Sequence, residues 1–405
     1  MIRRDFLIKS GILSTGAILA GKSVLTSCTG SGKYRELSKH TIDKVEFGHI
    51  NWSWPRFVGK NGRIGRHGQH HRLNVVQLKT DQGASGWGVA AYGKEKDTEA
   101  LASLVKGKTV DQIFNPDTGI LADDYRSFDF ALHDLAGIIM DMPVYKMLGS
   151  KGPKATPVYS GMIYFDELEP EEDPGGLDNI LKNCHWDYDY GYRQLKAKIG
   201  RSGRWYPHDE GLALDIEVIK LMREEFGDKI EILVDANDAY TLQDSIDFLK
   251  GIEGIPLYWF EEPFVETYEE GKQLKEWMMV NGRKDTYYAD GERKPDFDVC
   301  MRLGREGLMD VYLADIVGLG FSPWRNLMPS LIATGMLTSP HGWSTMIKTH
   351  YITHISAGMG NVCTVEGATI TSDDIDLGNY QIKDGKITVS EDPGFGMKLI
   401  NFTKV

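Results

Sequence analysis

Between residues 42 and 92, apolar and polar positions alternate in short runs, a pattern typical of half-buried β-strands. One run lies before residue 51, a second spans residues 73–78, and an Asp81-Gln82-Gly83 turn separates the second from a third at residues 86–89. From residue 98 to residue 148 the apolar residues recur every three or four positions, most regularly from Phe128 to Ile139, before a stop at Gly149. A sheet of hairpins followed by helices predicts a separate α+β domain over residues 42–156.

Beyond Pro157 apolar strand-like runs alternate with helix-like segments, and this rhythm predicts parallel strands joined by helical crossovers. The spacing between successive strand ends suits a (β/α) barrel of about 250 residues, so we assign residues 157–370 to a barrel. The eight expected strands are 158–163, 194–199, 230–234, 258–260, 286–289, 311–314, 336–338 and 361–365. The helices expected between them include 212–226, 242–249, 269–279, 296–303, 324–334 and 347–355.

The first residues carry the features of an export signal, and we exclude them from the fold. Arg3-Arg4 precedes an apolar stretch from Gly11 to Gly21, and Leu25-Thr26-Ser27-Cys28 follows it. These residues resemble a twin-arginine signal and a lipobox whose Cys28 is acylated after cleavage. We therefore expect a signal over residues 1–27, a flexible tether over residues 28–41, and an exported bacterial protein, periplasmic or anchored as a lipoprotein. A plain cleaved signal or an N-terminal anchor is the alternative.

Composition and charge narrow the class of partner. The chain has 405 residues, of which 41% are hydrophobic and 26% are charged, which is ordinary for a large folded protein. Its formal net charge of -12 and its pI near 5.4 disfavour nucleic acid and anionic lipid as partners. Contact with a membrane is therefore expected only through an N-terminal lipid anchor.

Polar residues close the expected barrel strands, which is where barrel enzymes carry their chemistry. Asp235, Glu261 and Glu292 close three consecutive strands, so their carboxylates should converge at one rim. A group of buried charges is costly unless a metal ion or a substrate satisfies it. Three oxygen ligands without Cys or His suit Mg²⁺, with Mn²⁺ as the alternative, better than Zn²⁺. The other polar residues at these strand ends are Lys196, Lys198, Asn237, Glu262, Asp315, His341 and Glu366.

A series of motifs occurs in order along the chain: FDFALHDLAGIIMDMPVYKMLG from Phe128, then LKAKIG, VDANDAY, WFEEPF, ADGER, ADIVGLG, PHG and VEGA. Together they resemble the mandelate racemase subgroup of the enolase superfamily, which includes the muconate lactonizing enzymes. The resemblance covers nearly all of residues 42–405, and DPGFG from Asp392 resembles that family's return to a capping domain. It implies an α/β fold, a modified (β/α)7β TIM barrel, with an α+β capping domain completed by residues 371–405. It also implies a homo-oligomer.

The resemblance further implies a metal centre with one Mg²⁺ per subunit. Asp235, Glu261 and Glu292 would be its ligands. Asn237 and Glu262 would lie behind these ligands, although simple polarity at a strand end explains the two residues equally well.

The same resemblance assigns the acid and base groups. It implies Lys198 as one base and His341, paired with Asp315, as a second base on the opposite face of the substrate. Lys196 would bind the substrate carboxylate, and a protonated Glu366 would hydrogen-bond to it.

This set of residues suits removal of the proton next to a carboxylate through an enediolate, because that intermediate needs fixed positive charge where it forms. Loss of a β-hydroxyl then gives dehydration, whereas reprotonation from the other face gives racemisation or epimerisation. The resemblance favours dehydration of an aldonate or aldarate to a 2-keto-3-deoxy acid. A racemase, epimerase or cycloisomerase of the same superfamily is the alternative, and a non-catalytic, exported carbohydrate-binding lipoprotein is a hypothesis of another class.

Substrate choice is expected to come from the capping domain, where residues 51–54 and 63–72 lie in the region of the family's specificity loop. Arg63, Arg66, His67, His70 and His71 would bind hydroxyl groups or a second carboxylate. A solvated loop with no role in binding explains the same five residues equally well.

Overall fold

The computed structural model describes residues 34–91, 97–202, 204–370 and 372–405. The predicted signal at residues 1–27, Cys28 and the first part of the predicted tether lie outside the described residues. Within the described ranges, no helix combines the length and the apolar character that a membrane crossing requires.

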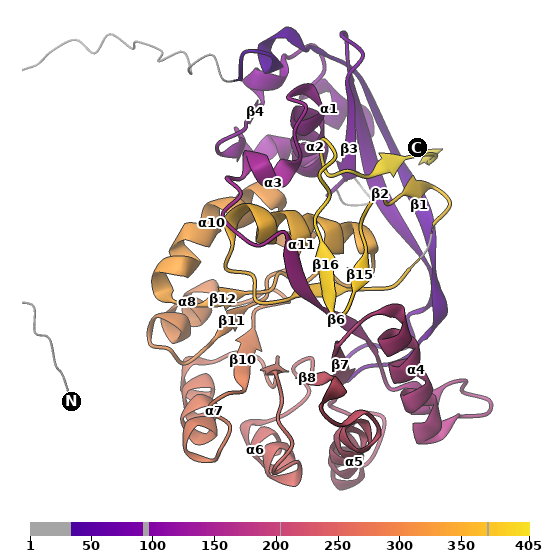
Figure 1. Cartoon of the computed structure of the whole chain (residues 1–405), viewed down its shortest axis with the longest axis vertical. Helices are drawn as coiled ribbons and strands as arrows, with labels where there is room; N and C mark the ends of the chain where they lie inside the picture. Colours follow the sequence, from indigo (N-terminus) through magenta and orange to yellow (C-terminus); the bar gives the residue numbers. More distant parts are fainter. Residues whose placement is uncertain (1–33, 92–96, 203, 371) are drawn as a thin grey trace, which may run out of the picture.

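An antiparallel sheet with its helices forms the capping part, at the top of Figure 1. Its strands are β1 (Ile42–Val58), β2 (Gly68–Thr80), β3 (Ser85–Val89) and the C-terminal β18 (Thr403–Lys404), in the order β18-β1-β2-β3. After them come α1 (Thr98–Ser103), the short pair β4 (Phe114–Asn115) and β5 (Gly119–Ile120), α2 (Asp129–Ile139) and α3 (Val144–Met147). Helix α2 packs closely on β3 because Gly86 has no side chain: a Cβ there would lie 2.4 Å from the backbone nitrogen of Leu135.

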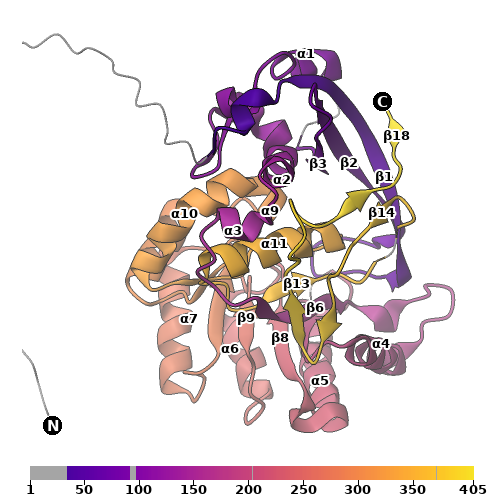
Figure 2. The same ribbon diagram turned by 45° about the horizontal axis from the view of Figure 1, so that its top comes forward.

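A closed ring of parallel strands forms the second part, and it confirms the predicted TIM-type barrel. Within the described chain its eight strands are β6 (Ala155–Ile163), β7 (Gln194–Lys198), β8 (Glu231–Asp235), β9 (Trp259–Glu261), β10 (Tyr287–Asp290), β11 (Val311–Tyr312), β12 (Leu337–Thr338) and β13 (Val365–Gly367). The helices are α4 (Gly176–Tyr190), α5 (His208–Phe226), α6 (Leu242–Gly251), α7 (Tyr268–Val280), α8 (Phe297–Arg305), α9 (Ile316–Leu319), α10 (Phe321–Thr334) and α11 (Met346–Met359). Figure 2 shows α4 to α7 around the outside of the strands.

The eighth strand begins later than expected. The sequence predicts a strand over 361–365, whereas β13 spans Val365–Gly367 and pairs with β6. Asn361 adopts a left-handed backbone conformation with φ of 66°, which no regular strand contains. The preceding segment instead reaches β12 through one isolated bridge between Thr338 and Val362, and this bridge closes the barrel.

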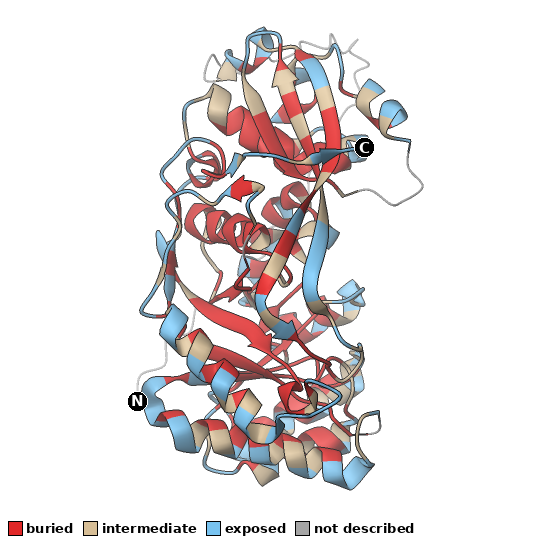
Figure 3. Ribbon diagram, turned by 90° about the vertical axis from the view of Figure 1, so that its right-hand side faces the viewer, coloured by how far each residue is buried: buried red, intermediate tan, exposed pale blue. Residues whose placement is uncertain are grey.

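The C-terminal segment returns across the barrel to the capping part. Strand β16 (Lys386–Thr388) pairs with the first residues of β6 and with β15 (Ile382–Lys383), and β14 (Ile375–Asp376) pairs with β17 (Lys398–Leu399). The DPGFG motif then contacts α2 and α3: Phe395 N donates to Asp134 Oδ1 at 2.8 Å, and Gly394 O accepts from Val144 N at 2.9 Å. Figure 3 shows buried residues in the interior of both the barrel and the capping part. The C-terminal return segment thus connects the barrel to the capping sheet.

Candidate active site

The register of the parallel strands brings the predicted residues to one end of the barrel. Lys198, the last residue of β7, pairs with Asp235, the last residue of β8, and Asp235 pairs in turn with Glu261, the last residue of β9. Glu292 lies two residues beyond the end of β10. Because carboxyl ends of parallel barrel strands share one rim, the structure gathers these side chains as the sequence predicts.

Asp235, Glu261 and Glu292 form a group that can hold a metal ion. One carboxylate oxygen from each lies within 4.8 Å of the others, and the three side chains are buried or half-buried. The second oxygen of Glu292, Oε2, is buried and has no hydrogen-bond partner among the described residues. An all-oxygen donor set with an unsatisfied carboxylate oxygen fits a hard divalent cation such as Mg²⁺.

Two lysines offset part of this negative charge. Lys196 Nζ lies 2.9 Å from Glu261 Oε1 and 3.2 Å from both Asp235 Oδ2 and Glu366 Oε1. Burial opposes the charge of Lys196, but Glu261 and Glu366 together raise its pKa well above the usual value. Lys198 Nζ donates to Asp235 Oδ2. Burial would raise the pKa of Asp235, but the charges of Lys198 and Lys196 outweigh burial and lower this pKa below its usual value. Lys196 therefore stays cationic at the centre of the site.

His341 and Asp315 form the predicted pair on the other side of the carboxylates. His341 Nδ1 lies 2.8 Å from Asp315 Oδ2, while Nε2 lies 3.5 Å from Glu292 Oε1 and 3.6 Å from Glu366 Oε2. Burial would lower the pKa of His341, but Glu292, Glu366 and Asp315 raise it overall. Lys348 Nζ, which the sequence did not single out, lies 2.9 Å from the same Asp315 oxygen. Asp315 thus orients the ring and supports its protonated form.

The pKa of Glu366 lies below its usual value, which does not favour the protonated form that the resemblance implies. Burial alone would raise its pKa, but Lys196 and His341 outweigh burial and, with the Gly342 N–H that donates to Oε2 at 2.8 Å, place the pKa below the usual value. Glu366 Oε1 lies 3.2 Å from Lys196 Nζ, and its protonated form with a substrate bound stays a prediction.

Asn237 and Glu262 lie directly behind the metal-ligand group. Asn237 N donates to Asp235 Oδ1 at 2.9 Å, and Glu262 Oε1 accepts from Arg293 N at 3.2 Å. Both residues have left-handed backbone conformations, with φ of 46° and 39°, and each has a buried side-chain oxygen without a partner among the described residues. Backbone strain of this kind is concentrated at functional sites, and here it turns the chain sharply after two strands that carry ligands.

The two arginines predicted to meet the substrate are paired with protein carboxylates. Arg63 Nη1 lies 3.0 Å from Asp238 Oδ2, and Arg66 Nε lies 3.0 Å from Glu169 Oε2. Their carboxylate partners lie more than 100 residues further along the chain, so the sequence pattern gave no sign of them. These arginines tie the capping part to the barrel.

Of the predicted capping histidines, His67 reaches the site. Its ring centre lies 5.0 Å from that of Tyr164 and 4.8 Å from that of Trp343, and Lys198 Nζ lies 5.6 Å from the Tyr164 ring centre. The sequence did not single out Tyr164 or Trp343, although Trp343 follows His341 by two residues. His70 lies on β2 rather than in a loop, with Nδ1 at 2.8 Å from Ser53 Oγ.

Comparison with known proteins identifies a family that this chain matches. Residues 181–401 match the family model described as "Enolase C-terminal domain-like". Among curated proteins, an arabinonate dehydratase of Saccharolobus solfataricus is 27% identical over 150 residues, which are 37% of this chain and 36% of that enzyme. The chain thus spans about a third of that relative. A D-galactarolactone cycloisomerase of Agrobacterium fabrum is 23% identical over 292 residues, 68% of this chain and 72% of that enzyme.

Solved structures of a galacturonate dehydratase from Geobacillus sp. are similar over almost the whole described fold. One, complexed with D-galacturonate and 5-keto-4-deoxy-D-galacturonate, is 30% identical with a TM-score of 0.82 and covers 89% of this chain and 95% of its own. A mutant of that enzyme complexed with Mg is 29% identical with a TM-score of 0.83, covering 90% and 94%.

Proposed function

The chain belongs to the enolase superfamily, and on that premise we propose that it is a Mg²⁺-dependent lyase that dehydrates a sugar acid after removing the proton next to the carboxylate. Relatives named as an arabinonate dehydratase, a galacturonate dehydratase and a D-galactarolactone cycloisomerase support an enzyme of this kind. The expected product is a keto-deoxy acid.

The positions of the two candidate bases carry this proposal. Lys198 stands at the end of β7, and His341 lies beyond the end of β12. The strands that lead to Asp235, Glu261 and Glu292 lie between them in the order of the barrel sheet. A substrate seated over the three carboxylates therefore meets a proton-transfer group on each flank.

The side chains divide the work as follows. Lys196 binds the substrate carboxylate and neutralises the second negative charge that develops on it. Lys198 Nζ accepts the α proton, and His341 Nε2 donates a proton to the β-hydroxyl, which leaves as water. Asp315 Oδ2 stays hydrogen-bonded to His341 Nδ1 throughout, at the distance of 2.8 Å seen in the structure. When bound, Mg²⁺ adds positive charge at the substrate carboxylate.

The test is turnover of a panel of aldonic, aldaric and uronic acids with Mg²⁺, with and without chelator, read as semicarbazone formation by the keto product. We expect at least one acid to be dehydrated, and Lys198→Ala and His341→Asn each to lose most of that activity. Lys220→Ala, at an exposed position on α5, is the matched control. An unchanged rate in Lys198→Ala contradicts the assignment, and tight sugar binding without turnover favours a binding protein.

A racemase, epimerase or cycloisomerase uses the same geometry, because groups on two flanks can remove a proton on one side and return it on the other. Repeating the panel in D₂O separates the outcomes. Deuterium at the α carbon of a recovered acid of inverted configuration indicates epimerisation, whereas a deoxy product labelled at the former β carbon indicates dehydration.

We also propose that the enzyme is exported and tethered through Cys28, on the strength of the predicted signal. Labelling of cells with a palmitate analogue, compared between the full chain and Cys28→Ala, tests this. Loss of label together with release of the protein from the membrane fraction is expected, and label that persists in Cys28→Ala contradicts it.

A further inference from the structure

Tyr164 is a side chain of the catalytic rim that the proton-transfer steps do not use. It directly follows β6, and Ile163, the last residue of that strand, pairs with Ala197, so Tyr164 comes to lie beside Lys198. Lys198 Nζ lies 5.6 Å from the centre of the Tyr164 ring. The side chain is only 2% exposed, and a tyrosine buried in this way usually places its hydroxyl group against a hydrogen-bond partner.

The phenol group of Tyr164 lies among the catalytic charges without being bonded to any of them. Burial raises the pKa of Tyr164 well above its usual value, while Lys196 opposes and Glu366 adds to this shift, so both are close enough for their charges to act on the phenol. Its Oη atom makes no hydrogen bond with the described residues and stays open to solvent, unlike Trp343 Nε1, which is buried without an acceptor. Tyr164 therefore offers an uncharged O–H donor to a molecule bound at the rim.

His67, from the capping part, packs against this tyrosine and offers the complementary group. Its ring centre lies 5.0 Å from that of Tyr164 and 4.8 Å from that of Trp343. Nδ1 lies 2.8 Å from Gly59 O, and because a carbonyl oxygen only accepts, Nδ1 carries the hydrogen. Burial lowers the pKa of His67 and outweighs the bond to Gly59, and the charge of Lys198 lowers this pKa further. Nε2 of the neutral ring is therefore a hydrogen-bond acceptor, and it has no partner among the described residues.

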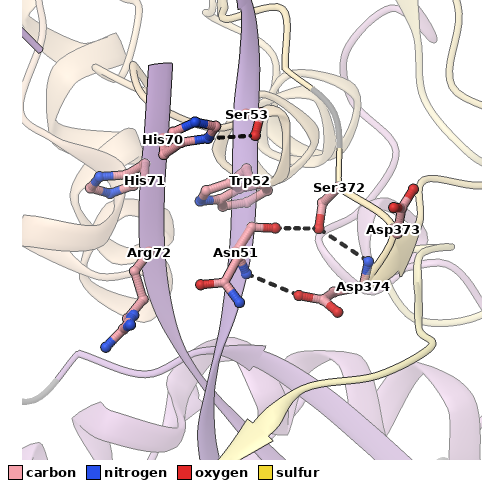
Figure 4. A pocket seen from close by; sticks show the side chains of 9 residues that line it. All are labelled: Asn51, Trp52, Ser53, His70, His71, Arg72, Ser372, Asp373 and Asp374. Carbon is pink, nitrogen blue, oxygen red and sulfur yellow. Dashed lines mark hydrogen bonds between the residues drawn. The ribbon is translucent and has the colours of Figure 1, made fainter. Parts of the chain in front are cut away.

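His70 has a different position, although it follows His67 by only three residues. Figure 4 shows the open hollow between the β1–β2 ribbon and residues 372–374, which His70 helps to line. There its Nδ1 lies 2.8 Å from Ser53 Oγ. His70 is therefore a matched control for His67, because it is the same type of residue in the same part of the chain.

The basic residues of the neighbouring capping segment are paired with carboxylates of the barrel. Lys60 Nζ lies 3.5 Å from Glu169 Oε1, Arg63 pairs with Asp238, and Arg66 pairs with Glu169. In the described segment from Lys60 to Arg66, no basic side chain therefore remains unpaired. A second substrate carboxylate would need such a partner, because burying a charge is costly unless it is paired.

We propose that Tyr164 and His67 bind the end of the substrate away from its carboxylate, Tyr164 Oη as donor and His67 Nε2 as acceptor, and that the substrate is a sugar acid with a single carboxylate. Because Lys196 holds that carboxylate inside the barrel, the far end of the chain extends to the capping part and meets His67. A hydroxyl group donates a hydrogen to Nε2, whereas an ionised carboxylate has no hydrogen to donate. An aldonate or a uronate fits this arrangement, and an aldarate does not. This inference rests on the proposed function and narrows its substrate class.

The test compares acids that differ at the far end: D-gluconate with D-glucarate, and D-galactonate and D-galacturonate with galactarate. We expect kcat/KM for a monocarboxylic acid to exceed that for its dicarboxylic counterpart by about tenfold or more, equivalent to ~1.4 kcal/mol. His67→Asn keeps a donor for Gly59 O and removes Nε2, so it should lower this ratio severalfold. Tyr164→Phe keeps the ring and removes the donor, and it should raise KM for the monocarboxylic acid severalfold with a smaller change in kcat, because the reacting groups stay in place.

Two matched controls accompany these variants. His70→Asn changes the histidine at the hollow of Figure 4, and Tyr190→Phe changes a tyrosine that is 43% exposed at the end of α4. Neither should alter the ratio or KM.

The outcomes separate the inference from the proposed function. If a dicarboxylic acid is turned over at least as well as its monocarboxylic counterpart, or if His67→Asn and Tyr164→Phe behave like the parent, the inference is wrong while the proposed function stands. If no acid is turned over, the proposed function fails, and calorimetric titration of D-gluconate and D-glucarate into the Mg²⁺-loaded protein decides the inference. Tighter binding of gluconate that Tyr164→Phe weakens supports it. Equal or tighter binding of glucarate, or binding of neither acid, overturns it.

Discussion

Arg201 holds the backbone of the proposed base Lys198, and its replacement offers a sharp test of how the site is supported. Its fully buried guanidinium donates to Glu167 Oε1 and Oε2 at 2.8 and 3.0 Å, to Asp215 Oδ1 at 2.7 Å, and to the carbonyl oxygen of Lys198 at 3.0 Å. Burial opposes this charge, but Glu167 and Asp215 raise the pKa of Arg201 above its usual value. One side chain therefore ties β7 to α5 and to the segment after β6.

Arg201→Met keeps much of the volume and removes every donor. Two buried carboxylates then lose their counter-charge, and breaking a buried pair from one side costs about 3–5 kcal/mol. We expect the free energy of unfolding from a denaturant titration to fall by that amount. Turnover should fall by about tenfold or more even where the protein is folded, because misplacing a reacting group by about 1 Å costs up to ~100-fold.

Two controls keep this prediction sharp. Arg305→Met, at an exposed position on α8, should change the unfolding free energy by less than about 0.5 kcal/mol. In a double-mutant cycle, Arg201→Met and Glu167→Gln should couple by more than about 1 kcal/mol, because the two side chains are in direct contact. A loss below about 1 kcal/mol in Arg201→Met, or additive effects in the cycle, would refute this account of the network.

Three further outcomes follow from the charges. Mg²⁺ at about 100 times its dissociation constant should raise the unfolding free energy by about 2.7 kcal/mol, seen as a thermal shift that Asp235→Asn and Glu292→Gln abolish; an equal shift in both variants contradicts the metal centre. Burial would raise the pKa of Asp315, but Lys348 and His341 outweigh burial and lower this pKa below 3.8. The carboxylate of Asp315 therefore adds stability that is present above pH 3.8 and is lost on acidification. Because Lys348→Met removes part of this pKa shift, the variant should lose less stability than the parent between about pH 5 and pH 3. Burial lowers the pKa of His354 from 6.5 to about 3, so the stability of the protein should fall as the pH drops from 6.5 to about 3. His354→Phe should reduce this dependence of stability on pH, measured as the denaturant midpoint at each pH. An unchanged pH dependence would show that another group titrates.

The sequence predicted the barrel and most of its rim because two physical regularities reinforce one another. Parallel strands buried on both faces appear as continuous apolar runs, and the residue that ends each run must then lie at a common edge. Asp235, Glu261 and Glu292 could be placed together on this reasoning alone, and the parallel register places them as expected. The eighth strand was misplaced because the left-handed Asn361 interrupts an otherwise apolar stretch.

Contacts between segments that are distant in the sequence could not be predicted from the sequence alone. Lys348 lies on α11, where residues around it are buried on all sides, so no amphipathic pattern shows which way its side chain points. Arg63 and Arg66 looked available for substrate because their partners, Asp238 and Glu169, are contributed by the barrel loops. The lowered pKa of Glu366 depends on its distance of 3.2 Å from Lys196, which only the folded chain defines.

The central claim is that Lys198 removes the α proton and His341 assists the departure of water. Exchange of the substrate α proton in D₂O with Mg²⁺, followed by proton NMR in variants, tests it most directly. His341→Asn should still exchange the α proton while releasing little keto-deoxy acid, and Lys198→Ala should do neither. Exchange at the parental rate in Lys198→Ala would contradict the account.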